Sequence, residues 1–159
     1  CAASDCNKGQ YEDIDFDSPD TAFSYWREYL LNYETRYWDP SPSRSVSRQA
    51  PDHTENFSFF SNEIIFVGIN MVGGEVHDDQ EWAQRHAANL EWVESAYNTY
   101  GAEARVMVVF AHAAPGHLKN DGFYNPFFLM AGQEFSNLRV VLIHRNLIYQ
   151  TAGFNQDYD

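Results

Sequence analysis

The sequence predicts a layered α/β fold, in which helices pack on a β-sheet. Residues 106–111, VMVVFA, are apolar without alternation, which is typical of a strand buried on both faces at the centre of a sheet. Two further runs, 63–70 and 138–144, are also apolar and rich in β-branched residues. An amphipathic segment at 78–100 separates the run 63–70 from the central strand. Strands and helices therefore alternate along this part of the chain, as they do in α/β domains.

The first third of the chain is less regular. Residues 1–17 carry acids without apolar periodicity and predict an irregular acidic segment whose spacing matches no EF-hand. Ser18 as N-cap and Pro19 at the first helical position begin a predicted helix over about 19–35. Its apolar stripe consists of Ala22, Phe23, Trp26, Leu30 and Tyr33. Residues 39–55 are rich in Ser, Pro and charge and predict a long surface loop.

The predicted elements follow one another closely from residue 57 onward. Residues 57–60 and 63–70 predict a hairpin-like pair of strands around Ser61-Asn62. The helix at 78–100 carries His86 on its apolar face, where we expect a packed core histidine. A further helix is predicted near 126–135, and the tail at 146–159 is polar and weakly patterned. The predicted order is strand, strand, helix, strand, helix, strand, within a single domain over 1–159.

Composition excludes several classes of protein. The chain has 159 residues, of which 44% are hydrophobic and 16% aromatic, so it can form a real core. Its formal net charge of −13 repels phosphate backbones, which excludes nucleic acid as a partner. The absence of a long uncharged apolar run excludes insertion into a membrane.

Several small features predict an extracellular or cell-surface protein. The chain begins with Cys1 rather than Met, as expected of a processed product or a piece of a longer chain. Cys1 and Cys6 fit either a small disulfide loop or two separate thiols. Asn56 lies in the N-glycosylation triplet Asn56-Phe57-Ser58, which matters only if the chain is secreted.

Polar residues end the predicted strands. His112 follows the central strand and precedes a turn of small residues that leads to His117. Asn70 ends the strand at 63–70, and His144 ends the last strand. The carboxyl ends of strands are where open α/β sheets place ligand groups, and histidine is a common metal ligand. A histidine that merely caps a strand in a polar turn is the alternative for His112.

Four stretches together resemble the calcineurin-like metallophosphoesterases. They are ENFSF at 55–59, IIFVGINMVGGEVHDDQEW at 64–82, NLEWV at 89–93 and VVFAHAAPG at 108–116. The resemblance covers about residues 20–145 and corresponds to the second half of that family's α/β sandwich. It implies a phosphoesterase-like scaffold, on which the family binds a dinuclear Fe, Mn or Zn centre.

The resemblance also implies which residues correspond to the family's metal ligands. His112 matches the lone histidine of the family, and His144 matches the first histidine of its last block, Gly-His-x-His. In that block Ile143 replaces the glycine and Asn146 replaces the final histidine, while Arg145 adds a positive charge. The earlier Asp-x-His and Gly-Asp blocks are missing from this chain. We therefore interpret His112 and His144 as relics, with Asn146 as the weakest ligand candidate, and expect no cofactor and no catalytic residue.

Three functional hypotheses follow. The first is a non-catalytic metallophosphoesterase-like domain with a structural or self-assembly role outside the cell, bound to copies of itself or to another chain. The second is a metal-dependent phosphoesterase whose ligand-bearing N-terminal half is missing from this chain. The third is a secreted carbohydrate- or peptide-binding module that uses exposed aromatic residues such as Tyr33, Tyr37 and Trp38.

Overall fold

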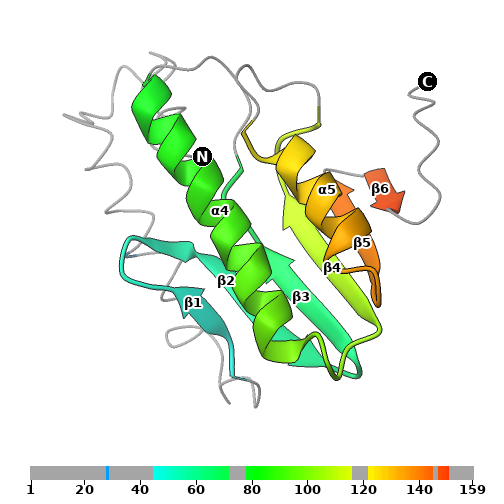
Figure 1. Ribbon diagram of the computed structural model, residues 1–159. Helices are drawn as coiled ribbons and strands as arrows, with labels where there is room; N and C mark the ends of the chain where they lie inside the picture. The colour runs from blue at the N-terminus through cyan, green and yellow to red at the C-terminus, as the bar shows by residue number, and fades with distance from the viewer. Residues whose placement is uncertain (1–27, 29–44, 72–77, 116–121, 145–146, 151–159) are drawn as a thin grey trace. The chain divides into compact units, whose positions relative to one another are not determined.

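A computed structural model describes part of the chain: residues 28, 45–71, 78–115, 122–144 and 147–150. By internal contacts the chain splits into two compact units, Cys1–Ser45 and Val46–Asp159. Every strand and helix described below belongs to the second unit (Figure 1). The predicted acidic segment and the predicted helix over about 19–35 lie outside the described residues, apart from Glu28. The single domain over 1–159 stays a prediction.

One mixed sheet of six strands organises the second unit, and its spatial order is β1-β2-β3-β4-β5-β6. The central strands β3, β4 and β5 are parallel, whereas β1, β2 and β6 pair antiparallel with their neighbours. The spatial order equals the order in the sequence, so the chain crosses the sheet once from edge to edge. The strands are β1 (Ser47–Gln49), β2 (His53–Ser61), β3 (Ile64–Gly68), β4 (Val106–Ala111), β5 (Arg139–His144) and β6 (Leu147–Gln150).

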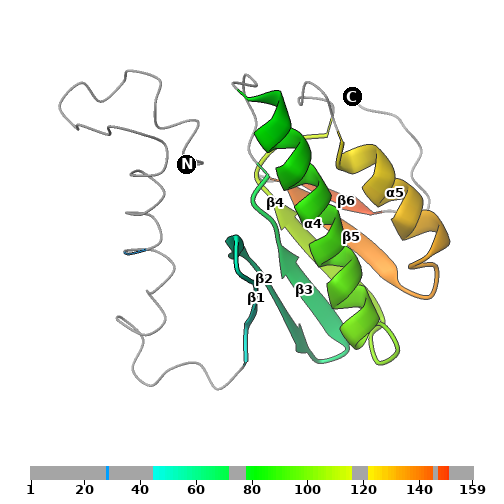
Figure 2. The same ribbon diagram turned by 60° about the vertical axis from the view of Figure 1, so that its left-hand side comes forward.

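Two helices connect the parallel strands. Helix α4 (Asp79–Tyr100) joins β3 to β4, and helix α5 (Tyr124–Gln133) joins β4 to β5. Both helices lie on the same face of the sheet, as the two views show (Figures 1 and 2). This follows because both crossovers move the chain in the same direction across the sheet and crossovers share one hand. Neither described helix is both long and apolar enough to cross a membrane.

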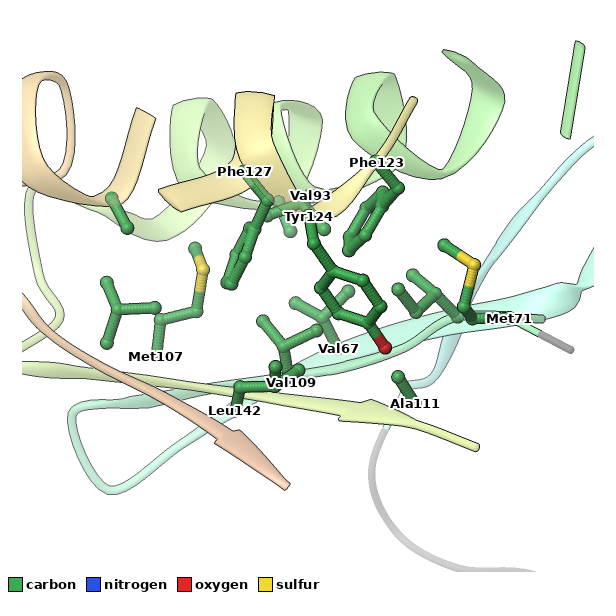
Figure 3. Packing of buried hydrophobic residues seen from close by; sticks show 14 of the residues in the cluster. Val67, Met71, Val93, Met107, Val109, Ala111, Phe123, Tyr124, Phe127 and Leu142 are labelled. Carbon is green, nitrogen blue, oxygen red and sulfur yellow. The ribbon is translucent and has the colours of Figure 1, made fainter. Parts of the chain in front are cut away.

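The hydrophobic core lies between these helices and the sheet (Figure 3). Successive strand residues point to opposite faces, so every second residue of the parallel strands reaches this core. The helices complete it with Val93 of α4 and the aromatic residues that begin α5. Its fully buried members include Ile65, Val67, Val93, Met107, Val109, Phe123, Phe127, Val140 and Leu142.

Most predicted elements of the second unit are confirmed. The predicted helix at 78–100 is α4, and its N-cap Asp78 accepts hydrogen bonds from the backbone N–H groups of Gln80 (2.9 Å) and Glu81 (3.0 Å). The predicted hairpin is β2–β3, with its turn one residue later than expected. There Asn62 and Glu63 both have positive φ, 52° and 62°, as the tightest hairpins require.

The prediction that residues 106–111 are buried on both faces is wrong. They form β4, whose Met107 and Val109 are fully buried, whereas Phe110 on the other face is 36% exposed. An unbroken apolar run is typical of a strand that is buried on both faces. A strand that is buried on one face and carries apolar side chains on its exposed face has the same pattern. The two helices described here cover only one face of β4.

Two edge strands were not predicted. Part of the expected surface loop at 39–55 is strand β1 and the start of β2, and β6 lies in the tail that showed little pattern. The loop prediction is therefore wrong from residue 47 onward, apart from the β1–β2 connection, whereas residues 39–44 lie outside the described residues. Edge strands of this kind form because a neighbouring strand offers hydrogen bonds, not because of their own propensity.

Candidate functional site

A buried amide network fixes the carboxyl end of β3. The side-chain oxygen of Asn56 on β2 accepts a hydrogen bond from the backbone N–H of Asn70 (2.6 Å). The side-chain nitrogen of Asn56 donates to Gln49 Oε1 on β1 and to Asn89 Oδ1 on α4, both at 2.7 Å. Asn89 in turn donates to the carbonyl oxygen of Asn70 (3.0 Å), and both Asn56 and Asn89 are fully buried. The network thus ties three strands and a helix together where β3 ends.

Glu55 lies beside this network but on the opposite face of the sheet, since it precedes Asn56 in β2. The side chain of Glu55 is only 5% exposed. Its Oε1 accepts a hydrogen bond from Asn70 Nδ2 (3.2 Å) and lies 3.4 Å from His53 Nδ1. Its Oε2 is buried and has no hydrogen-bond partner in the structure, although a carboxylate accepts several donors. A bound ligand that donates a hydrogen bond to this buried oxygen would remove the free-energy cost of leaving it unsatisfied.

His112 lies at the same edge of the sheet as Asn70. Two backbone hydrogen bonds, both 3.0 Å, join the chain segments that contain Asn70 and His112. They run from Ile69 N to Phe110 O and from Ala113 N to Met71 O. His112 is exposed, as expected for a residue just beyond the carboxyl end of β4. Asn70 and His112 thus follow neighbouring parallel strands at one edge of the sheet, and the side chain of Asn70 contacts Glu55 of β2.

The other candidate metal ligand lies in a different environment. His144 ends β5 and is 2% exposed, and it continues the alternation that buries Val140 and Leu142 toward the helices. No group of three or more His, Cys, Asp or Glu in the described part of the chain is arranged to hold a metal ion. Cys1, Cys6, His117 and Asn146 lie outside the described residues. The interpretation of His112 and His144 as relics of metal ligands stays a prediction.

The predicted core histidine is confirmed. His86 on α4 is 3% exposed, and its Nδ1 accepts a hydrogen bond from the backbone N–H of Gly122 (3.1 Å). Its ring packs against Trp82, with 5.5 Å between the centroids. His86 therefore connects α4 to the start of α5 and does not belong to the strand-end group.

The geometry at Asn56 disfavours the predicted glycosylation. A glycan would be attached to the side-chain nitrogen, which here donates to Gln49 and Asn89 inside the protein. The whole residue is 0% exposed. A glycosylated Asn56 would have to give up both hydrogen bonds and leave buried acceptors unsatisfied.

A row of phenylalanine rings covers the sheet face opposite the described helices. We call this row, Phe57, Phe59, Phe66 and Phe110, the aromatic face. Ring centroids are 6.4 Å apart for Phe57 and Phe59, 4.7 Å for Phe59 and Phe66, and 6.5 Å for Phe66 and Phe110. The planes of neighbouring rings differ by at most 15°, so the rings form one stack across β2, β3 and β4.

Gly68 and Arg48 shape the β2 side of this row. Phe57 stands opposite Gly68 in the β2–β3 register, and a Cβ atom at Gly68 would lie 2.1 Å from Phe57 Cε1. The ring of Phe57 thus lies directly over the backbone of β3. The guanidinium carbon of Arg48 lies 5.8 Å from the centroid of the same ring, a cation–π distance.

Sequence reasoning missed Glu55 and the aromatic face. The available signal was the alternation of Phe57 and Phe59 in β2, which places both rings on one face of a strand. Glu55 has the same parity, so the pattern places it beside those rings. The pattern gave no sign that the carboxylate would be buried.

Comparison with known proteins identified no relative. No family model matched the chain, and neither a curated protein nor a solved structure matched it significantly. The resemblance to metallophosphoesterases therefore stays an expectation, and the structure supports the coarser assignment of an α/β protein with a mixed sheet.

Proposed function

We propose that this chain is a non-catalytic interaction domain that self-associates through the aromatic face in a structural assembly outside the cell. The observation that carries the proposal is the stacked row of phenylalanine rings on the sheet face that no described helix covers. Phe110 in this row is 36% exposed. The other three rings of the row are half-buried. Apolar side chains gathered on one face in this way support a contact site, because burying their exposed parts is favourable.

A second copy of the chain suits this face for two reasons. Apolar faces of two sheets pack against each other with about 10 Å between the sheets. In a dimer with two-fold symmetry, the same face of both copies forms the contact. The same side of the sheet also carries both signs of charge, with Arg48 over Phe57 and Glu55 two residues along β2. Each copy therefore offers the other a cation and a carboxylate, although the whole chain carries a net charge of −13.

Sedimentation velocity of the full chain over a range of concentrations tests the proposal. Phe110→Thr removes an aromatic ring and keeps a residue that favours strands. We expect it to weaken self-association by about tenfold or more, as removal of a buried aromatic anchor does. Leu129→Gln is the matched control, because Leu129 is 62% exposed on α5 and α5 lies on the other side of the sheet. The control should associate like the unmodified chain.

The salt dependence of association provides a second readout. Two copies that each carry a net charge of −13 repel each other, so added salt should strengthen a contact made by apolar rings. A chain that stays monomeric at every concentration would overturn the proposal. So would self-association that Leu129→Gln disrupts as strongly as Phe110→Thr.

A further inference from the structure

We infer that Glu55 forms an acceptor site for a guanidinium group. The group belongs to an arginine side chain that a second copy of this chain presents at the end of the aromatic face. The inference rests on the proposed function, because it takes the aromatic face to be the docking surface. It adds the chemistry of the polar contact beside the rings. Three properties of Glu55 carry it: its burial, its unused oxygen and its position in the sheet.

The carboxylate of Glu55 has fewer donors than a buried carboxylate needs. Its side chain is 5% exposed, so water satisfies little of its hydrogen-bonding capacity. The described contacts reach only Oε1, from Asn70 at 3.2 Å and from His53 at 3.4 Å, and the second is long for a hydrogen bond. Oε2 has no hydrogen-bond partner. A buried charged oxygen without a donor is costly, and a ligand that supplies one removes that cost.

The chemistry of the missing donor favours a guanidinium. It brings positive charge and parallel N–H groups that match a carboxylate, and it loses less hydration than an ammonium does. The same side of the sheet already holds a guanidinium over a ring, since Arg48 lies 5.8 Å from the centroid of Phe57. The strong negative charge of the chain adds a long-range attraction for any basic group.

The position of Glu55 joins the site to the aromatic face. Glu55 accepts a hydrogen bond from the side chain of Asn70, which lies two residues beyond Gly68, the residue beneath the ring of Phe57. Glu55 therefore lies on the same side of the sheet as Phe57. The side chain of His53, whose Nδ1 lies 3.4 Å from Glu55 Oε1, is 28% exposed, so the carboxylate lies next to a side chain that reaches solvent.

Titration of the isotope-labelled full chain with N-acetyl-arginine methylamide, followed by NMR, tests the site. The neutral citrulline analogue, added at the same ionic strength, is the matched ligand control. We expect saturable shifts around Glu55, Asn70 and His53 with the arginine compound and none with the citrulline compound. Glu55→Gln, which keeps an acceptor for Asn70 and loses the charge, should weaken binding by about tenfold or more.

Glu63→Gln is the control for a general loss of negative charge. Glu63 lies in the β2–β3 turn at the other end of the sheet, is 57% exposed, and pairs with Arg105 at 3.2 Å. Its substitution should leave arginine binding unchanged. Shifts that both ligands produce equally, or binding that Glu55→Gln leaves intact, would overturn the inference.

Two further arrangements keep the experiment decisive. If Glu55→Gln fails to fold, Glu55→Asp keeps the charge on a shorter side chain, and the shift map of the unmodified chain still locates any site. The titration is performed at a concentration where the chain is monomeric. Failure of self-association therefore leaves this measurement intact, and absence of arginine binding leaves the sedimentation result intact.

Discussion

Asn56 shows how a single side chain organises the strand-end region. Its oxygen accepts from the N–H of Asn70, and its nitrogen donates to Gln49 and Asn89, so both ends of the amide are used. No other residue type of this size supplies an acceptor and two donors in this arrangement. Asn56 therefore holds the end of β3 in place, and with it the Asn70 side chain that contacts Glu55.

The amide nitrogen of Asn56 can be tested by an isosteric change. Asn56→Asp keeps the acceptor for Asn70 but places a carboxylate oxygen against the side-chain oxygens of Gln49 and Asn89. We expect the free energy of unfolding at neutral pH to fall by about 3 kcal/mol, because the carboxylate oxygen that replaces the amide nitrogen is buried and faces two acceptor oxygens. Urea denaturation measures this loss.

The exposed Asn98 on α4 provides the control. Asn98→Asp makes the same chemical change on the helix surface and should alter stability by less than about 0.5 kcal/mol. Equal losses for the two variants would show that the buried network contributes nothing specific to stability.

At the scale of elements, β3 depends on its neighbours on both faces. Toward the helices it contributes the fully buried Ile65 and Val67, and on the other face Gly68 leaves room for the ring of Phe57. The same strand thus serves the core on one side and the aromatic face on the other.

The fit of Phe57 over Gly68 predicts the effect of an added methyl group. Gly68→Ala places a Cβ atom 2.1 Å from Phe57 Cε1, so the ring must move. We expect the free energy of unfolding to fall by about 1–3 kcal/mol, as for other overpacked sites. The change should also shift the NMR signals of the neighbouring rings.

Gly132 on α5 offers a matched control for this substitution. A Cβ atom at Gly132 would have no neighbour within 4 Å, and a helical Gly→Ala change raises stability by up to about 1 kcal/mol. Thermal or urea denaturation of both variants gives the comparison. A Gly68→Ala variant as stable as Gly132→Ala would contradict the close packing of Phe57.

For the whole molecule, metal content separates the proposed role from that of a metal-dependent phosphoesterase. We expect less than one Fe, Mn or Zn ion per chain by elemental mass spectrometry of protein purified without chelators. The described residues contain no group of three or more His, Cys, Asp or Glu that could hold a metal ion, and two-metal hydrolases need several such ligands. About two ions per chain would contradict the non-catalytic role and favour the phosphoesterase.

Much of the second unit was predictable from sequence because its signals are local. Residues close in sequence determine the cap and periodicity of α4 and the apolar runs of β3, β4 and β5. They also determine the order of these elements along the chain. Strand β1 and strand β6 were not predictable in this way, because pairing with a neighbouring strand decides whether an edge segment is extended. The candidate site was predictable only in part: Asn70 and His112 ended predicted strands, whereas Glu55 did not.

The sequence by itself determined the α/β class, the helix α4, the core strands and the negative charge of this protein. Only the tertiary structure decided that both described helices cover one face of the sheet and that a stack of phenylalanine rings lies on the other. It also decided that Glu55 is buried with one oxygen unused. The physical reason is that periodicity records which side of an element is apolar, whereas burial and hydrogen bonding depend on what packs against that side.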